Sequence, residues 1–242
     1  MFYLYNLILY RPLLNSLVFI YNILPLHDLG VAIVLLTILI RLILFPLFHK
    51  SARHQAKLQK IQPHLKKINE THKNDAEKKV QATMALYREH EINPFAPFLL
   101  LLIQLPILIA LYQIFSDILH PDILNSLYPW VHPPADLNPT FLGLINLGKS
   151  SMVVAVLVAL AQFAQMGLSF TAPAGSKTRT EKITQRATVY LIPIFLFLFV
   201  FTNLPAAVNL YWLTTTLFSA GQQIIINREI HGKLEPVSKT TN

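Results

Sequence analysis

The chain contains no cysteine, and none of its twelve carboxylates lies within a long apolar run. The first absence excludes disulfides and thiolate metal sites. The second removes the intramembrane carboxylate that serves as a proton relay in pumps, and it weighs against that class of protein. Glycine is also scarce, at seven residues, and no glycine-rich phosphate-binding motif occurs, which disfavours a nucleotide site.

Charged residues are the next shortage, because they make up 13% of the chain whereas 53% is hydrophobic. This leaves too little polar surface to cover a soluble globule, so the composition predicts a multi-pass membrane protein. A helix needs about 20 apolar residues to cross the hydrocarbon core. The candidate spans are residues 29–48, 95–115, 152–171, 189–202 and 206–226, the fourth of which is short.

One cation lies inside the first candidate span. Arg41 has no Asp or Glu in any of the spans as a partner, and a lone cation at membrane depth costs about 2.5–3.5 kcal/mol on insertion scales. We expect water and neutral dipoles to solvate it, which requires a wet cavity inside the protein. Because arginine stays charged, it can donate hydrogen bonds to a passing carboxylate or carbonyl without exchanging protons. The sequence therefore predicts a docking role for Arg41 and not a catalytic one.

Neutral polar side chains recur at the predicted membrane depth and can line such a cavity together with Arg41. They are Thr37, Gln104, Gln162, Gln165, Asn203, Asn209, Thr214, Thr215 and Thr216. Any one of them alone is better explained by a hydrogen bond between two helices.

The nine histidines do not form a recognisable metal motif. His49 and His54 are five residues apart, off the shared helix face that a pair of ligands needs, and no HExxH motif occurs. We therefore expect no metal, no cofactor, no enzymatic activity and no nucleic-acid specificity.

The expected fold class is an all-α membrane protein with five transmembrane helices. Residues 1–28 are expected to form an outer interfacial helix, with a sixth crossing as the alternative. Residues 29–226 form the five-span core, and the tail is 227–242. Most Lys and Arg lie in segments 50–91 and 173–188 and in the tail, and the positive-inside rule places these in the cytoplasm, with the N-terminus outside.

Residues 50–91 are expected to form a cytoplasmic antiparallel helical hairpin within the core. Apolar residues recur at helical spacing on both arms, and Pro63 is expected to bend the first arm. The stripes are Leu58, Ile61, Leu65 and Ile68 on the first arm and Ala76, Val80, Met84 and Tyr87 on the second.

Several motifs resemble one family in order and spacing. LTILIRLILFPL at residues 36–47 resembles the first conserved span of the YidC/Oxa family of membrane-protein insertases. YREHEINP at 87–94 and LIQLPI at 102–107 are similar to the start of its second span. FAQM at 163–166, IPI at 192–194, LPA at 204–206 and NLYW at 209–212 follow in the later spans. The resemblance covers essentially the whole chain.

The resemblance implies a short family form without a large periplasmic domain, in the bacterial inner membrane. It implies a hydrophilic groove that is open to cytoplasm and lipid and closed outside. Arg41 would attract the hydrophilic segment of a nascent membrane protein, Gln104, Gln165 and Trp212 would line its path, and its apolar helix would leave into the lipid bilayer. The basic hairpin is a candidate contact for the Sec translocon, a ribosome or a targeting receptor, although a merely solvated charged surface explains its charge as well.

Two other functions stay open from the sequence. A small-anion channel or transporter would use Arg41 as its ion-binding site. A structural assembly factor would bind other membrane proteins through the hairpin and would not need Arg41.

Overall fold

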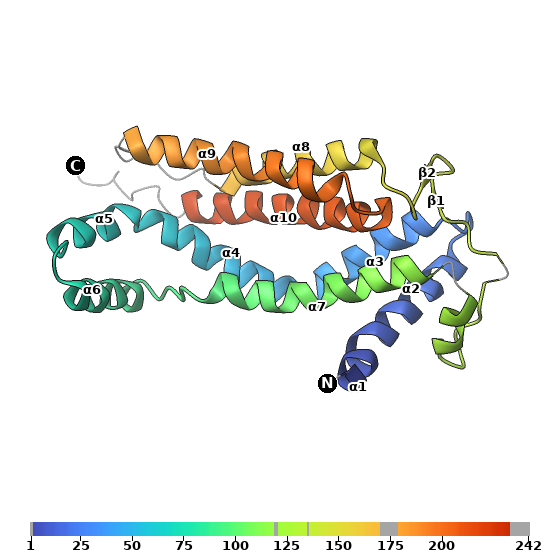
Figure 1. Cartoon of the computed structure of the whole chain (residues 1–242). Helices are drawn as coiled ribbons and strands as arrows, with labels where there is room; N and C mark the ends of the chain where they lie inside the picture. Colours follow the sequence, from blue (N-terminus) through green and yellow to red (C-terminus); the bar gives the residue numbers. More distant parts are fainter. Residues whose placement is uncertain (1, 119–120, 135, 170–178, 233–242) are drawn as a thin grey trace, which may run out of the picture.

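The computed structural model describes residues 2–118, 121–134, 136–169 and 179–232, and its regular structure there is almost entirely helical (Figure 1). This confirms an all-α membrane protein, with one short β-hairpin whose two strands have two residues each. The helices are α1 (Phe2–Tyr5), α2 (Arg11–Ile23), α3 (Leu29–Ile43), α4 (Phe45–Lys60), α5 (Gln62–Thr71), α6 (Ala76–Glu89), α7 (Ala96–Asp117), α8 (Met152–Ser169), α9 (Arg179–Leu196) and α10 (Ala206–Gly232). The π-helical turns η1 (Asn6–Tyr10) and η3 (Phe197–Phe201), the 3-10 helix η2 (Pro121–Ser126) and the strands β1 (Thr140–Phe141) and β2 (Ile145–Asn146) complete the order. The end of the third predicted span, the start of the basic segment 173–188 and the tail from residue 233 lie outside the described residues.

The predicted spans differ in how long and how straight they are. Within the described part of the chain, Phe98–Asp117 of α7 and all of α8 are long and apolar enough to cross a membrane. The first predicted span is not one helix, because it bends by 68° at Leu44 between α3 and α4. Pro46 explains the bend, since it has no backbone N–H and its ring clashes with the carbonyl one turn earlier. α9 and η3 together add a shorter apolar helix, Val189–Phe201.

The buried core lies at the end of the bundle where α2 meets α3 (Figure 1). On α2, Leu14, Leu17, Val18 and Tyr21 follow one helix face and are almost completely buried. They pack with the first turns of α3, α8 and α10 and the last turns of α7. The small side chains of α8 and α10 allow these two helices a long contact.

A short β-hairpin is fixed onto the start of α3. Asp28 caps this helix, because one carboxylate oxygen accepts a hydrogen bond from the Val31 N–H at 2.8 Å. Its other oxygen accepts one from the Leu142 N–H in the hairpin at 2.6 Å. The Phe141 ring fills the space beside Gly30, where a Cβ atom would clash with it. These contacts seal the bundle at the α2 end.

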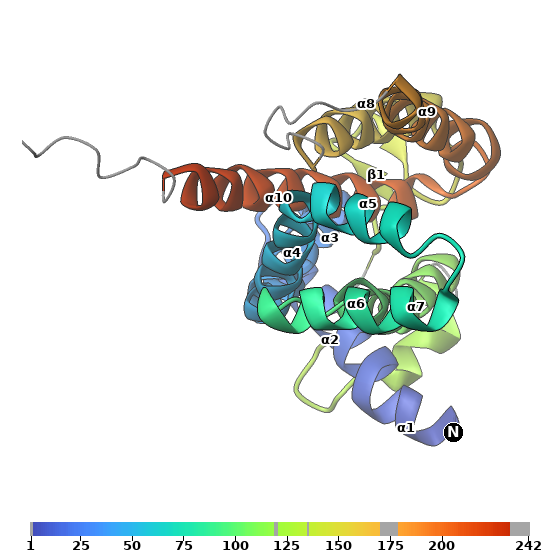
Figure 2. The same ribbon diagram turned by 90° about the vertical axis from the view of Figure 1, so that its left-hand side faces the viewer.

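At the opposite end, α5 and α6 form an antiparallel helical hairpin (Figures 1 and 2). Pro63 lies in the first turn of α5, after a break at Ile61. All four residues of the apolar stripe predicted for the first arm pack in the small hairpin core. The stripe predicted for the second arm is wrong in part, because Val80 and Met84 are 58% and 41% exposed. Leu86 is buried instead, since the two arms pack together mainly near the base of the hairpin.

We expect Gly30→Ala to destabilise the fold, because the added methyl group needs the space that the Phe141 side chain occupies. Overpacking of this kind costs about 1–3 kcal/mol, more than the helix propensity gained by alanine. The measurement is the thermal unfolding midpoint in detergent. Gly167→Ala is the matched control, because nothing lies within 4 Å of a Cβ at that helical glycine. Equal midpoints for the two variants would contradict the tight contact between α3 and the β-hairpin.

Candidate functional site

A groove of about 370 Å³ lies between α3, α4, α7, α8 and α10, on the hairpin side of the buried core. Side chains of α4 and of the second half of α10 form the part nearest the hairpin. The polar lining residues are Arg41, Gln55, Gln104, Gln162, Gln165, Ser169, Tyr211, Thr215, Thr216, Ser219, Gln222 and Gln223. The apolar ones are Phe48, Ala52, Leu100, Leu101, Leu108 and Trp212. The groove therefore gathers polar side chains, beside apolar ones, inside a largely apolar bundle.

All four site residues expected from the sequence line this groove. Arg41 comes from α3, Gln104 from α7, Gln165 from α8 and Trp212 from α10. The fold thus brings together residues that are far apart in the sequence. Their common location makes a shared role possible, and their role in substrate binding stays a prediction.

Arg41 lies in the last turn of α3, where helix carbonyls carry a partial negative charge that favours a cation. The residue is only 6% exposed. Its guanidinium carbon lies 4.2 Å from the centre of the Phe48 ring, a cation–π contact. Nη1 is buried without a hydrogen-bond partner, and no ion pair found among the described residues includes Arg41. The guanidinium is therefore sequestered but not neutralised, and it keeps a free donor.

Two hydrogen bonds connect the helices across the groove. Gln104 of α7 donates from Nε2 to the hydroxyl oxygen of Tyr211 on α10. The Thr216 hydroxyl on α10 donates to Oε1 of Gln162 on α8 at 3.3 Å. These residues therefore form hydrogen bonds between helices, which is the alternative that the sequence left open. They also line the groove.

Sequence reasoning did not single out many of the lining residues, among them Phe48, Tyr211, Gln222 and Gln223. On α10 the signal was present, because Tyr211, Thr215, Ser219 and Gln222 follow one another at 4-4-3 spacing on one helix face. Phe48 carries no comparable signal in the sequence. Its contact with Arg41 depends on the bend between α3 and α4.

Other polar residues expected at membrane depth do not line the groove. The Thr37 hydroxyl donates to the Ile33 carbonyl at 2.6 Å, and the Asn209 amide donates to the Phe201 carbonyl at 2.7 Å. Asn203 is exposed in the turn before α10, and Thr214 donates to the Leu210 carbonyl. The hypothesis that these four residues share the cavity with Arg41 is wrong, since at least three of them satisfy backbone carbonyls of their own or the preceding helix. In the part of the chain that the structure describes, no three His, Asp or Glu side chains converge as metal ligands.

The groove predicts a difference in water access along α8. Gln165 lines it, whereas Val158, two turns away, is completely buried in the core. A thiol reacts with maleimide only as a hydrated thiolate, and the chain has no cysteine of its own. We expect a water-soluble maleimide to label Gln165→Cys in native membranes and to label Val158→Cys only after denaturation. Equal labelling of the two variants would contradict a hydrated groove.

Comparison with known proteins agrees with the motifs. The family described as "60Kd inner membrane protein" matches residues 19–233. The protein named "Membrane protein insertase YidC" of Francisella tularensis subsp. novicida is 36% identical over 199 residues, which are 82% of this chain and 32% of that protein. Proteins of the same name from subsp. tularensis and subsp. holarctica match to the same extent. The chain spans about a third of the length of these curated relatives. Because the family match covers residues 19–233 and the sequence motifs follow the family in order and spacing, the chain belongs to the 60Kd inner membrane protein family, the YidC/Oxa family.

Proposed function

We propose that this chain acts as a membrane-protein insertase and not as an enzyme. The relatives that it matches are named as insertases. The observation that carries the proposal is the buried Arg41 guanidinium with a free donor in a polar groove. Its substrate class is the nascent membrane protein, whose hydrophilic segment has to pass the hydrocarbon core.

The groove lowers the barrier to this passage in two ways. A polar group that enters hydrocarbon without a hydrogen-bond partner is strongly disfavoured, and the glutamine and threonine side chains of the groove offer such partners. Arg41 adds a charge-assisted hydrogen bond to a carboxylate or carbonyl, which stabilises by about 1.5–3 kcal/mol. Gln104, Gln165 and Trp212 line the path next to it.

Release into lipid follows from the apolar outer faces of the bundle. Exposed side chains of α8 include Val153, Val156, Leu157 and Leu160. A substrate helix that slides along α8 and α10 exchanges polar surroundings for lipid, at about 25 cal/mol per Å² of apolar surface removed from water. No nucleotide is needed in this scheme, because the substrate's own hydrophobicity drives the last step.

The proposed topology has five spans in the bacterial inner membrane, with residues 1–28 at the outer surface and the tail in the cytoplasm. Three features support it: the basic hairpin lies at one end of the bundle, α2 lies at the other, and the helices between them alternate in direction (Figure 1). α3 with 15 residues and Val189–Phe201 would each rise only about 20–22 Å. Such short spans thin the bilayer beside them and shorten the dry path. The hairpin is the proposed contact for the Sec translocon, a ribosome or a targeting receptor.

We expect Arg41→Ala to reduce insertion of a single-span substrate with a short acidic outer tail by about tenfold or more, because the charge-assisted bond is lost. Arg41→Lys should retain part of the activity, since it keeps the charge but loses the planar fork. The measurement is protease protection of the substrate tail in proteoliposomes. Leu42→Ala is the matched control, because its side chain is exposed on the outer face of the same helix.

Normal insertion by folded Arg41→Ala would exclude the docking role. Chloride flux that depends on Arg41 in the same vesicles would instead support the anion transporter. The dense core between the groove and the α2 end argues against a continuous anion path.

A further inference from the structure

One face of α4 forms a wall of the groove. Phe48, Ala52 and Gln55 line it, and their spacing of four and three residues places them on the same helix face. α4 joins α3 through the 68° bend at Leu44 and contacts α7 as well as α10. The bend at Leu44 and the break at Ile61 set α4 apart as a helix of its own between α3 and α5.

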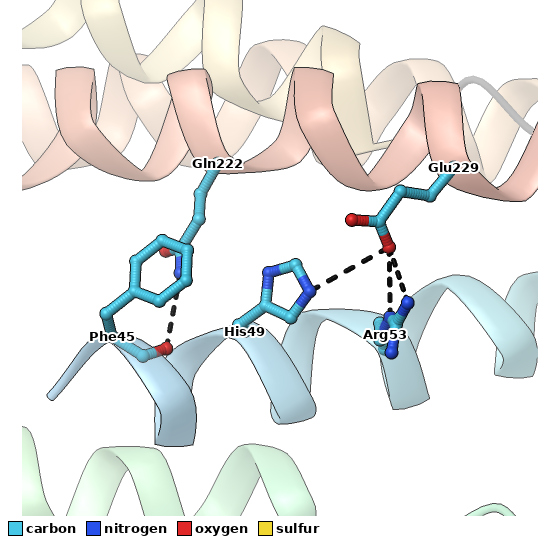
Figure 3. Close-up of polar contacts among 5 residues, drawn as sticks. All are labelled: Phe45, His49, Arg53, Gln222 and Glu229. Carbon is cyan, nitrogen blue, oxygen red and sulfur yellow. Dashed lines mark hydrogen bonds and ion pairs between the residues drawn. The ribbon is translucent and has the colours of Figure 1, made fainter.

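A second face of α4 forms polar contacts with α10 from three successive turns of α4 (Figure 3). Arg53 donates from Nε and Nη2 to one carboxylate oxygen of Glu229, at 3.2 and 2.6 Å. Nε2 of His49 lies 3.9 Å from the same oxygen. One turn earlier, the Gln222 amide donates to the Phe45 carbonyl at 3.4 Å. Together these contacts close α4 against the second half of α10.

Aromatic rings add further contacts within α4, between α4 and α10, and between α4 and Arg41. The Phe45 ring stacks on the His49 ring, with centres 5.4 Å apart and planes 19° apart. It also meets the edge of Phe218 on α10 at 6.5 Å. Phe48, on the neighbouring face of α4, covers the Arg41 guanidinium. The position of this cover therefore depends on how α4 is held.

We propose that Glu229 is a positioning residue that latches α4 to α10 through Arg53 and keeps Phe48 over Arg41. Release of the latch swings α4 about its joint at Leu44 and opens the groove to a substrate. The Arg53 and Glu229 side chains are 49% and 35% exposed. Exposed ion pairs are weak and sensitive to salt, so the arriving substrate can displace this one. What enters the groove rests on the proposed insertase function, whereas the motion of α4 does not.

The first test measures opening without any substrate. Glu229→Gln is combined with Gln165→Cys, and the rate of maleimide labelling at position 165 is compared with that of Gln165→Cys alone. We expect a rise of up to about fivefold, the range that a weak exposed ion pair can control. The charge exchange Arg53→Glu with Glu229→Arg should bring the rate back toward its starting value. Glu70→Gln, on the exposed surface of α5, is the control that removes the same charge elsewhere.

The second test fastens the latch. Arg53→Cys with Glu229→Cys is joined by a short bismaleimide that contains a cleavable disulfide, which is specific here because the chain has no other cysteine. We expect the joined protein to lose at least fivefold in insertion rate and to recover when the linker is reduced. The same double variant capped with N-ethylmaleimide on both cysteines is the control, and it should insert at the rate of the reduced protein.

The two tests separate the latch from the proposed function. Unchanged labelling in Glu229→Gln, or joined protein that inserts as fast as capped protein, overturns the latch. A labelling change that the charge exchange does not reverse also overturns it, because the pair would then not be the cause. Normal insertion by Arg41→Ala overturns the proposed insertase mechanism. The labelling result for α4 would still stand, because it is measured without a substrate.

Discussion

A guanidinium that no carboxylate of the described residues neutralises has to be solvated wherever the fold buries it, and this requirement governs the interior of the bundle. Arg41 is held at the end of α3, where the helix dipole and the Phe48 ring stabilise its charge without occupying all of its donors. The remaining stabilisation has to come from water and neutral dipoles. That is why glutamine and threonine side chains face one hollow in helices whose other faces are apolar.

The hollow can persist because the two ends of the bundle are built differently. At the α2 end, Asp28 holds the β-hairpin and Gly30 admits the Phe141 ring, and a dense apolar core fills the space between the helices. At the hairpin end, α4 replaces a straight continuation of α3 and contacts α10 through polar side chains. Dense packing resists opening, whereas an exposed ion pair does not. This difference favours the proposal that a substrate reaches Arg41 from the side of the basic hairpin.

Local sequence patterns predicted the elements whose environment is uniform. The apolar stretches of α7, α8 and the first half of α10 were visible as runs, and Arg41, Gln104 and Gln165 stood out because they interrupt such runs. Trp212 came from the family motif alone. The bend at Leu44 was missed because Pro46 was read as part of a span, and the cover by Phe48 follows only from that bend. Val80 and Met84 fit a helix stripe perfectly well and are still exposed, because the length of contact between two helices is decided by their geometry and not by either pattern alone.

In the proposed mechanism, the contact of Phe48 with Arg41 also determines how a substrate would act on the groove. A ligand shifts a conformational equilibrium only by the difference in its affinity for the two states. In the closed arrangement the ring covers one face of the guanidinium and hinders approach from that side, while Nη1 keeps a free donor. In the proposed open state a substrate carboxylate could contact the guanidinium from more directions, so it would bind that state more strongly and stabilise it. A neutral polar segment would gain much less from this difference, so in this mechanism the cation proposed to attract an acidic tail would also make the opening of the groove depend on that tail.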